Sequence, residues 1–426
     1  MKLSSILFFI FSFFHFLISS AVTSPDSVAP AEAKAKHWGA AVTFNPCIVP
    51  KSDAEIRLIT KHNRAWTLGG QLRYTAQPAD GSAIDADYNY PTLAVGINYN
   101  HYRNVDFHRD ANYDFGMGQE VDYMSRLGNT LTLYGSFERP WWRRNSWELS
   151  YALNFGVGYT DTKYDKYTNV DNEMIGSHFL IYCGMGIHAT YHFAHEWGVR
   201  AGLDFHHHSN GALHRPNKGS NTIGPVVALV YQPGYEAARH DSRELRNEAF
   251  QKYDYLNVTL GVGAKSLYED WTDTQFDTPP DDPAYRTNHF PLYAAYSLRI
   301  DGMRRWARRW ATGVGIDLLY GSHIGHVKRI DEAEGHNCYH SPWSVGISFK
   351  HEAYYHRLSC AMSLGGYVYR QMGHNARRVE KPFYETIGLR YTTPWLGGLQ
   401  AGFNVKAHAF KADLTEAVIV LPFKLK

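Results

Sequence analysis

The chain has 426 residues, and its 43 Lys and Arg against 41 Asp and Glu give a net charge of +2, which excludes a basic surface for nucleic acid. An aromatic content of 15% and 36 glycines favour many strands joined by tight turns. No run of 18 apolar residues follows the N-terminus, which excludes helical membrane spans. Mean hydropathy is −0.40, yet apolar and polar residues alternate in segment after segment. This combination predicts an all-β protein, an antiparallel transmembrane β-barrel.

The N-terminal segment 1–24 has the pattern of a signal peptide. A lysine at position 2 precedes an apolar run from Ile6 to Ile18, and Ser19 to Ala21 supplies small residues for cleavage. The alternative is a retained membrane anchor, which the shortness of the apolar run disfavours. Residues 25–36, rich in Ala, Pro and Ser, are expected to form a flexible leader. The mature protein is then expected to begin near His37, outside the cytoplasm.

Up to sixteen alternating segments follow, many of them ten or more residues long, as a tilted strand crossing a bilayer requires (about 9–11 residues). The clearest runs from Trp197 to Phe205, where apolar residues alternate with Gly198, Arg200, Gly202 and Asp204. We expect the apolar face to point to lipid and the polar face to line the lumen. The segments lie near 37–44, 64–76, 91–103, 129–138, 146–159, 177–193, 195–209, 221–232, 254–267, 289–301, 308–321, 342–353, 356–371, 381–393, 396–408 and 412–423.

The connections alternate between long and short, as expected for extracellular loops and periplasmic turns. Segment 233–253 is charged and of helical composition, and we interpret it as a periplasmic linker between two halves, 37–232 and 254–426. A weak echo between residues 221–224 and 385–388 makes duplication plausible. About 14–16 strands in one barrel is the favoured arrangement, and two tandem eight-stranded barrels are the alternative.

Neither the cysteines nor the histidines predict a metal site. Four cysteines are too few for a disulfide scaffold, and no pair has zinc-ligand spacing. A site from Asp204, His206 and His208 is possible in principle, but a hydrated lumen explains these residues as well. No metal and no cofactor is therefore expected. The four cysteines, interpreted as buried thiols or one incidental bridge, are Cys47, Cys183, Cys338 and Cys360.

His207 and Ser209 are the most informative polar pair. Serine attacks an ester only when a base takes its proton, and histidine suits that role near neutral pH. On a strand the two side chains share one face. This face continues the apolar stripe from Trp197 to Phe205, so the pair is expected at the extracellular end of a lipid-facing surface, where ionisable groups are costly. The alternative is a polar rim where the strand leaves the bilayer.

Segment 207–219 resembles the His-x-Ser-Asn signature of the outer-membrane lipid A 3-O-deacylase family, also called acyloxyacyl hydrolase-like. The residues that carry the resemblance are His207, Ser209, Asn210, Gly211, Asn217 and Gly219. The resemblance covers roughly residues 37–232 and is specific within the motif. It implies an eight-stranded barrel with a lipid-facing Ser and His that remove the 3-linked acyl chain of lipid A. The later half resembles the longer, two-half members of the Bacteroidetes type and has no nucleophile of its own.

The resemblance implies Ser209 as the nucleophile, His207 as the general base, and Asn210 and Asn217, with Gly211, as the positions that hold the oxyanion or the substrate. In shorter members a glutamate occupies the position of Asn221. Asparagine can still accept a hydrogen bond from imidazole, but it cannot stabilise imidazolium by charge. The chain end, Leu421 to Lys426, also lacks the usual terminal aromatic.

The sequence therefore predicts a serine esterase in the outer membrane of a Gram-negative bacterium, acting on the 3-O-linked acyl chain of lipid A in lipopolysaccharide, with no nucleic-acid partner. Two alternatives stay open. One is a phospholipase or acyl transferase with the same serine and histidine. The other is a non-catalytic barrel, a pore or adhesin, which the missing acidic residue at position 221 favours. Lumen width separates the pore from the others, because an eight-stranded barrel is filled by side chains.

Overall fold

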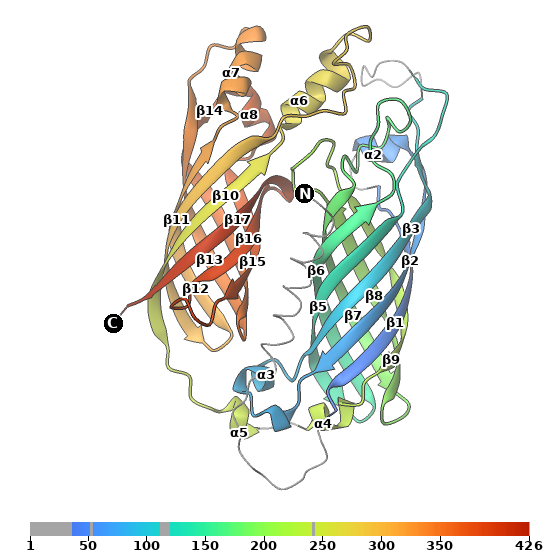
Figure 1. The fold of residues 1–426 in the computed structure, drawn as a ribbon, viewed down its shortest axis with the longest axis vertical. Helices are drawn as coiled ribbons and strands as arrows, with labels where there is room; N and C mark the ends of the chain where they lie inside the picture. The colour runs from blue at the N-terminus through green and yellow to red at the C-terminus, as the bar shows by residue number, and fades with distance from the viewer. Residues whose placement is uncertain (1–35, 52–53, 111–119, 241–242, 426) are drawn as a thin grey trace.

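The computed structural model describes residues 36–51, 54–110, 120–240 and 243–425 and contains two β-barrels that stand side by side (Figure 1). All paired strands are antiparallel. The strands of the first barrel are β1 (Trp38–Ile48), β2 (Thr60–Thr75), β3 (Thr92–Phe107), β5 (Thr130–Arg144), β6 (Trp147–Thr160), β7 (Phe179–His192), β8 (Trp197–Ser209) and β9 (Ser220–Tyr231), and a two-residue strand β4 (Ser125–Arg126) pairs with the end of β3.

The second barrel follows in the same manner, with each strand beside its sequence neighbour. Its strands are β10 (Tyr253–Lys265), β11 (Tyr293–Ala307), β12 (Trp310–Gly321), β13 (His340–Tyr355), β14 (Leu358–Met372), β15 (Phe383–Thr392), β16 (Gln400–His408) and β17 (Lys411–Lys424).

The prediction of an all-β antiparallel barrel protein is confirmed, but the favoured single barrel is wrong. Strand β9 pairs with β1, with Val227 opposite Phe44, and strand β17 pairs with β10, with Leu421 opposite Val258. Because each group of eight closes on itself, β9 and β10 are not hydrogen-bonded neighbours. The alternative of two tandem eight-stranded barrels is therefore the correct one.

Short helices lie at both ends of the barrels (Figure 1). At the end that carries α3, the linker between the barrels contains α4 and α5, in agreement with its helical composition. At the opposite end lie α2, α6, α7 and α8, which the sequence pattern had not indicated. The helices are α2 (Ala54–Ile59), η1 (Pro78–Asp80), α3 (Ala83–Asp87), α4 (Tyr235–Arg239), α5 (Arg243–Arg246), α6 (Tyr268–Thr272), η2 (Asp273–Asp277), α7 (Ile324–Ala333) and α8 (His374–Val379).

None of the helices in the described part of the chain is long and apolar enough to cross a membrane. The expected signal peptide 1–24 and all but the last residue of the expected leader 25–36 lie outside the described residues.

Both barrels are apolar outside and polar inside, as the alternation requires. On β8, Val199 and Leu203 are exposed on the outer face, whereas Arg200 is buried in the lumen. In the first lumen Arg200 and Arg73 both pair with Glu138. The second lumen is filled in the same way, since Arg299 pairs with Glu416 and Lys350 with Asp317. Side chains of opposite charge thus occupy both lumens, as expected for eight strands.

The two barrels contact each other along their length. Midway, the rings of Phe155 on β6 and Phe403 on β16 stack with centroids 4.9 Å apart. Near the α3 end, Arg308 of the second barrel bonds Asp87 of the first at 2.8 Å. At the opposite end, the loop that follows β8 forms hydrogen bonds with Thr415 and Ser266 of the second barrel.

Candidate active site

Strands β8 and β9 bring His207 and Asn221 together on the outer face of the first barrel. The two residues are direct partners in the antiparallel register. His207 Nδ1 lies 2.7 Å from Asn221 Oδ1. An amide oxygen only accepts hydrogen bonds, so Nδ1 carries the proton and donates it. In the neutral ring, Nε2 then has a free lone pair, which is the tautomer that a general base needs.

Ser209 lies two residues further along β8 on the same face. On a strand this spacing corresponds to about 6.5–7 Å between backbones. Within the described residues its hydroxyl makes no hydrogen bond to His207, and such contacts often tighten only when substrate is bound. Ser209 is 7% exposed, although Leu203 on the same face of the strand is 50% exposed. The serine therefore lies in a covered part of the outer surface.

Asn210 and Asn217 are joined within the loop between β8 and β9. The backbone N–H of Asn210 donates to Asn217 Oδ1 at 2.9 Å, and the backbone N–H of His214 donates to Asn210 Oδ1 at 3.3 Å. Among the described residues, Asn210 Nδ2 is buried without a hydrogen-bond partner. A buried amide donor costs free energy unless something accepts from it. An oxyanion that developed beside Ser209 would be such an acceptor.

Two glycines of this loop have conformations that other residues rarely adopt. Gly211 has φ +64°, and a Cβ there would lie 2.3 Å from Thr415 Oγ1 of the second barrel. Gly219 has φ +75°, and a Cβ there would lie 2.7 Å from His207 Cε1. A side chain at either position would push against the histidine or against the neighbouring barrel.

The second barrel holds the same loop through contacts that sequence reasoning missed. Thr415 Oγ1 donates to the carbonyl oxygen of Gly211 at 2.7 Å. Both the backbone N–H and the hydroxyl of Ser266 donate to the carbonyl of Ala212, at 2.7 and 2.9 Å. The Arg215 guanidinium returns a bond of 2.8 Å to the Ser266 carbonyl. No sequence motif marks these residues, because they lie on separate barrels and meet only after both have folded.

The neighbouring histidines, His206 and His208, point into the lumen, where each bonds to a separate hydroxyl group. His206 Nδ1 lies 2.6 Å from the hydroxyl of Tyr182, and His208 Nε2 lies 2.9 Å from that of Thr132. Asp204 bonds instead to His188, at 2.8 Å. Asp204, His206 and His208 thus bond to three different side chains of the lumen, and among the described residues His206 Nε2 and His208 Nδ1 have no hydrogen-bond partner. Within the described residues, the four cysteines form no disulfide bond.

The fold defines the class first: a β-barrel protein of the Gram-negative outer membrane, with an apolar outer surface and filled lumens. Comparison with known proteins then gives the family. A sequence model of the lipid A 3-O-deacylase (PagL) matches residues 82–229, and a model of the C-terminal domain of acyloxyacyl hydrolase matches residues 254–425. The chain belongs to the lipid A 3-O-deacylase family, and it is a carboxylic ester hydrolase.

Solved structures resemble the chain more distantly. The crystal structure of the outer membrane enzyme PagL is 12% identical, with a TM-score of 0.27, and the match covers 46% of this chain and 99% of that one. A mutant porin of Rhodopseudomonas blastica is 7% identical, with a TM-score of 0.15, and covers 91% of this chain and 99% of its own. No curated protein matches the chain.

Proposed function

We propose that this protein removes the 3-O-linked acyl chain of lipid A in the outer leaflet, with Ser209 as nucleophile, His207 as base and Asn221 as the residue that orients the base. The observation that carries the proposal is the 2.7 Å bond between His207 and Asn221 on the outer face, two residues from the serine. It supports the Nδ1–H tautomer, which leaves Nε2 free to take the serine proton.

The reaction follows the ordinary course of a serine esterase. Ser209 Oγ attacks the ester carbonyl while His207 Nε2 takes its proton, and the oxyanion accepts hydrogen bonds from the Asn210 amide, with Asn217 holding the backbone of that residue. The histidine then returns the proton to the leaving sugar oxygen. Water hydrolyses the acyl-serine with the same base, releasing the free fatty acid.

We assign the two halves different roles. Residues 37–232 carry the site, residues 233–253 are a periplasmic linker, and residues 254–426 contribute no nucleophile but hold the loop after Ser209 through Thr415 and Ser266. The filled lumens disfavour a pore, because charged pairs such as Arg200 with Glu138 occupy the first lumen.

The test is lipid A mass spectrometry and fatty-acid release with the wild type and with Ser209→Ala. We expect the variant to insert as a folded, heat-modifiable barrel and to lose deacylation, because only the attacking oxygen is removed. Ser220→Ala is the matched control: Ser220 is buried at the same end of the neighbouring strand but on the lumen face, and this variant should stay active.

Purified enzyme given lipid A and phospholipid in separate micelles distinguishes the substrate. Release of a 3-hydroxy fatty acid from lipid A alone supports the proposal. Lysophospholipid formation would assign a phospholipase with the same site, and transfer of the chain to a second lipid would assign an acyl transferase. Unchanged release from the folded Ser209→Ala protein would remove the serine mechanism.

A further inference from the structure

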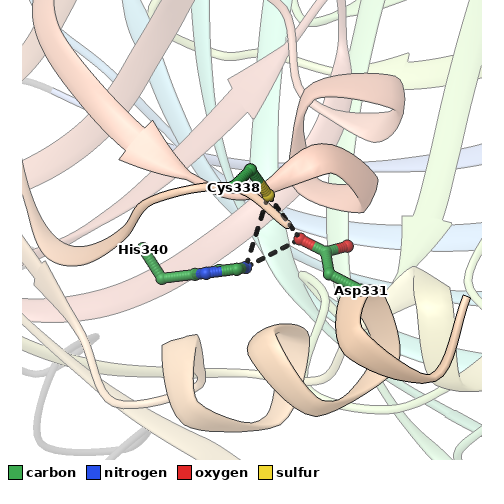
Figure 2. Close-up of side chains that lie close together, drawn as sticks. All are labelled: Asp331, Cys338 and His340. Atoms are coloured by element: carbon green, nitrogen blue, oxygen red, sulfur yellow. Dashed lines mark hydrogen bonds and ion pairs between the residues drawn. The ribbon is translucent and has the colours of Figure 1, made fainter. Parts of the chain in front are cut away.

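Three potential metal ligands converge at the α7 and α8 end of the second barrel (Figure 2). Asp331 lies in α7, Cys338 in the loop that follows, and His340 begins β13. The Asp331 Oδ2 atom lies 2.7 Å from His340 Nε2 and 3.4 Å from Cys338 Sγ, and the sulfur lies 3.8 Å from the same nitrogen. Carboxylate, thiol and imidazole are the three groups that bind Zn²⁺ in proteins.

The sulfur of Cys338 and the carboxylate of Asp331 lie at the same ring nitrogen of His340, and this distinguishes the cluster from a catalytic cysteine with its histidine base. In a catalytic Cys-His-Asp arrangement the sulfur and the carboxylate lie at opposite nitrogens of the imidazole. Here both face Nε2 of His340, as Figure 2 shows. A metal ion requires ligand atoms that surround one point, as these three atoms do. A proton relay requires a donor at one ring nitrogen and an acceptor at the other.

The separations suit a tetrahedral ion. With metal bonds of about 2.0–2.3 Å, ligand atoms around Zn²⁺ lie about 3.3–3.6 Å apart. The two distances from the sulfur, 3.4 and 3.8 Å, are close to this range. The 2.7 Å contact between His340 and Asp331 has to open by about half an ångström. His340 ends a loop, so a small movement of its ring is sufficient.

The second oxygen of the carboxylate is fixed independently. Asp331 Oδ1 accepts from the backbone N–H of Asn375 at 3.0 Å and from its side-chain amide at 2.9 Å, both at the start of α8. The backbone N–H of His374 donates to Oδ2 at 2.7 Å, which occupies one lone pair and leaves the other for the metal. Outer hydrogen bonds of this kind orient metal ligands in known sites.

A second group of potential ligands, Glu380, His408 and Asp413, is of a different kind. Lys265 bonds both acids, Arg370 also pairs with Glu380, and Lys406 lies 2.7 Å from Asp413. Because three buried cations already face the two carboxylates, a metal ion would add positive charge to a site that holds more cations than anions. The contrast shows what is particular to the first group: in the described structure neither Asp331 oxygen is paired with Lys or Arg.

We propose that Asp331, Cys338 and His340 bind one Zn²⁺ or similar thiophilic divalent ion, which ties α7, the start of β13 and, through Asn375, α8 together. On binding, the Cys338 thiol loses its proton to solvent and forms the sulfur–metal bond. His340 stays neutral and moves its proton from Nε2 to Nδ1, so that the Nε2 lone pair binds the ion. The fourth position is left to water, since Cys338 is only partly buried.

Co²⁺ titration of the full-length protein in detergent, prepared without a polyhistidine tag, tests the proposal. We expect one ion per chain with a thiolate-to-cobalt charge-transfer band, displaced by Zn²⁺. Cys338→Ser should lose the band, and Asn375→Ala should weaken binding about tenfold or more. Cys360→Ser is the control, because this thiol lies in strand β14 outside the cluster, and it should keep the band.

Zn²⁺ should also raise the thermal midpoint of the wild type and of Cys360→Ser, and leave that of Cys338→Ser and His340→Ala unchanged. Heat-modifiable migration reports whether each variant is folded. The absence of a thiolate band in folded wild-type protein, or its persistence in Cys338→Ser, would overturn the proposal. Lipid deacylation is a separate measurement, so the result does not depend on the mechanism at Ser209.

Discussion

Asn221 is the residue on which the proposed mechanism depends most directly, and replacing it by alanine removes one defined contact. His207 Nδ1 would lose its 2.7 Å partner, while the strand pairing between the two positions would stay. The imidazole could then rotate, and its proton could move to Nε2, which is the nitrogen that must be free to accept the serine proton. Turnover falls in proportion to the population of the correct tautomer and orientation.

The expected size follows from the hydrogen bond. Leaving a covered donor without its acceptor costs about 1–3 kcal/mol, and a factor of ten in rate corresponds to about 1.4 kcal/mol. We therefore expect Asn221→Ala to lower kcat by about 10- to 100-fold, with little change in KM, because the side chain orients the base and does not bind substrate. Because the same contact is lost in the folded protein, the free energy of unfolding should fall by no more than about 3 kcal/mol.

Asn221→Asp provides the opposite change at the same position. A carboxylate accepts the same hydrogen bond and also stabilises the imidazolium that forms in the transition state, and charge-assisted bonds are about twice as strong as neutral ones. Its activity should equal or exceed that of the wild type. Thr222→Ala, one residue along β9 and facing the lumen, is the control and should leave turnover unchanged. The assay is fatty-acid release from lipid A micelles at fixed pH. Wild-type turnover in folded Asn221→Ala would refute the assignment.

Three further predictions concern the surroundings of the serine. Thr415→Val should lower kcat about fivefold, because it removes one hydrogen bond to Gly211 that contributes about 1 kcal/mol. Thr415→Ser keeps the hydroxyl and should retain wild-type kcat. If Thr415→Val is fully active in a steady-state assay, the second barrel does not act on the loop. Gly219→Ala should lower turnover by more than tenfold, since its Cβ would lie 2.7 Å from His207 Cε1, and far-UV dichroism should still report a barrel. EDTA should leave deacylation by purified protein in micelles intact, because among the described residues no set of metal ligands lies on the face of Ser209. Loss of activity that stoichiometric metal restores would count against a metal-free site.

Local patterns were sufficient to predict the strands and the faces of the candidate residues. A period of two along β8 places Trp197 to Phe205 on one face, and the same count puts His207 and Ser209 there. Applied to β9, it also places Asn221 on that face. These predictions depend on the alternation of side chains along a strand, which is a property of the backbone and needs no knowledge of distant contacts.

The number of barrels could not be derived in this way. The alternation is the same in one sixteen-stranded barrel and in two eight-stranded ones, because each strand has one lipid face and one lumen face in both. The difference depends on whether β9 pairs with β1 or with β10, a contact between residues far apart in sequence. The length of the charged segment 233–253 was the sequence feature that favoured two barrels, since a turn between paired strands is usually much shorter.

The cluster of Asp331, Cys338 and His340 was missed for a related reason. No pair of cysteines has zinc-ligand spacing, so the spacing of the cysteines alone does not indicate this site. The local signal was a Cys-x-His sequence just after a helix that contains an aspartate. It becomes specific only when α8 fixes the carboxylate through Asn375, which lies 44 residues further along the chain.

The covered position of Ser209 gives a physical reason for the second barrel. A serine on the outside of an isolated eight-stranded barrel faces lipid or water on every side except the barrel wall. Here it is 7% exposed, and the loop that follows it is held by Thr415 and Ser266. Excluding water strengthens every electrostatic interaction in a site, including those with an oxyanion. Fixing the carbonyls of Gly211 and Ala212 also fixes the neighbouring Asn210 amide before substrate arrives, and donors already in place need no reorganisation during the reaction. On the proposed mechanism, the second barrel would therefore raise catalytic efficiency without supplying a reacting group.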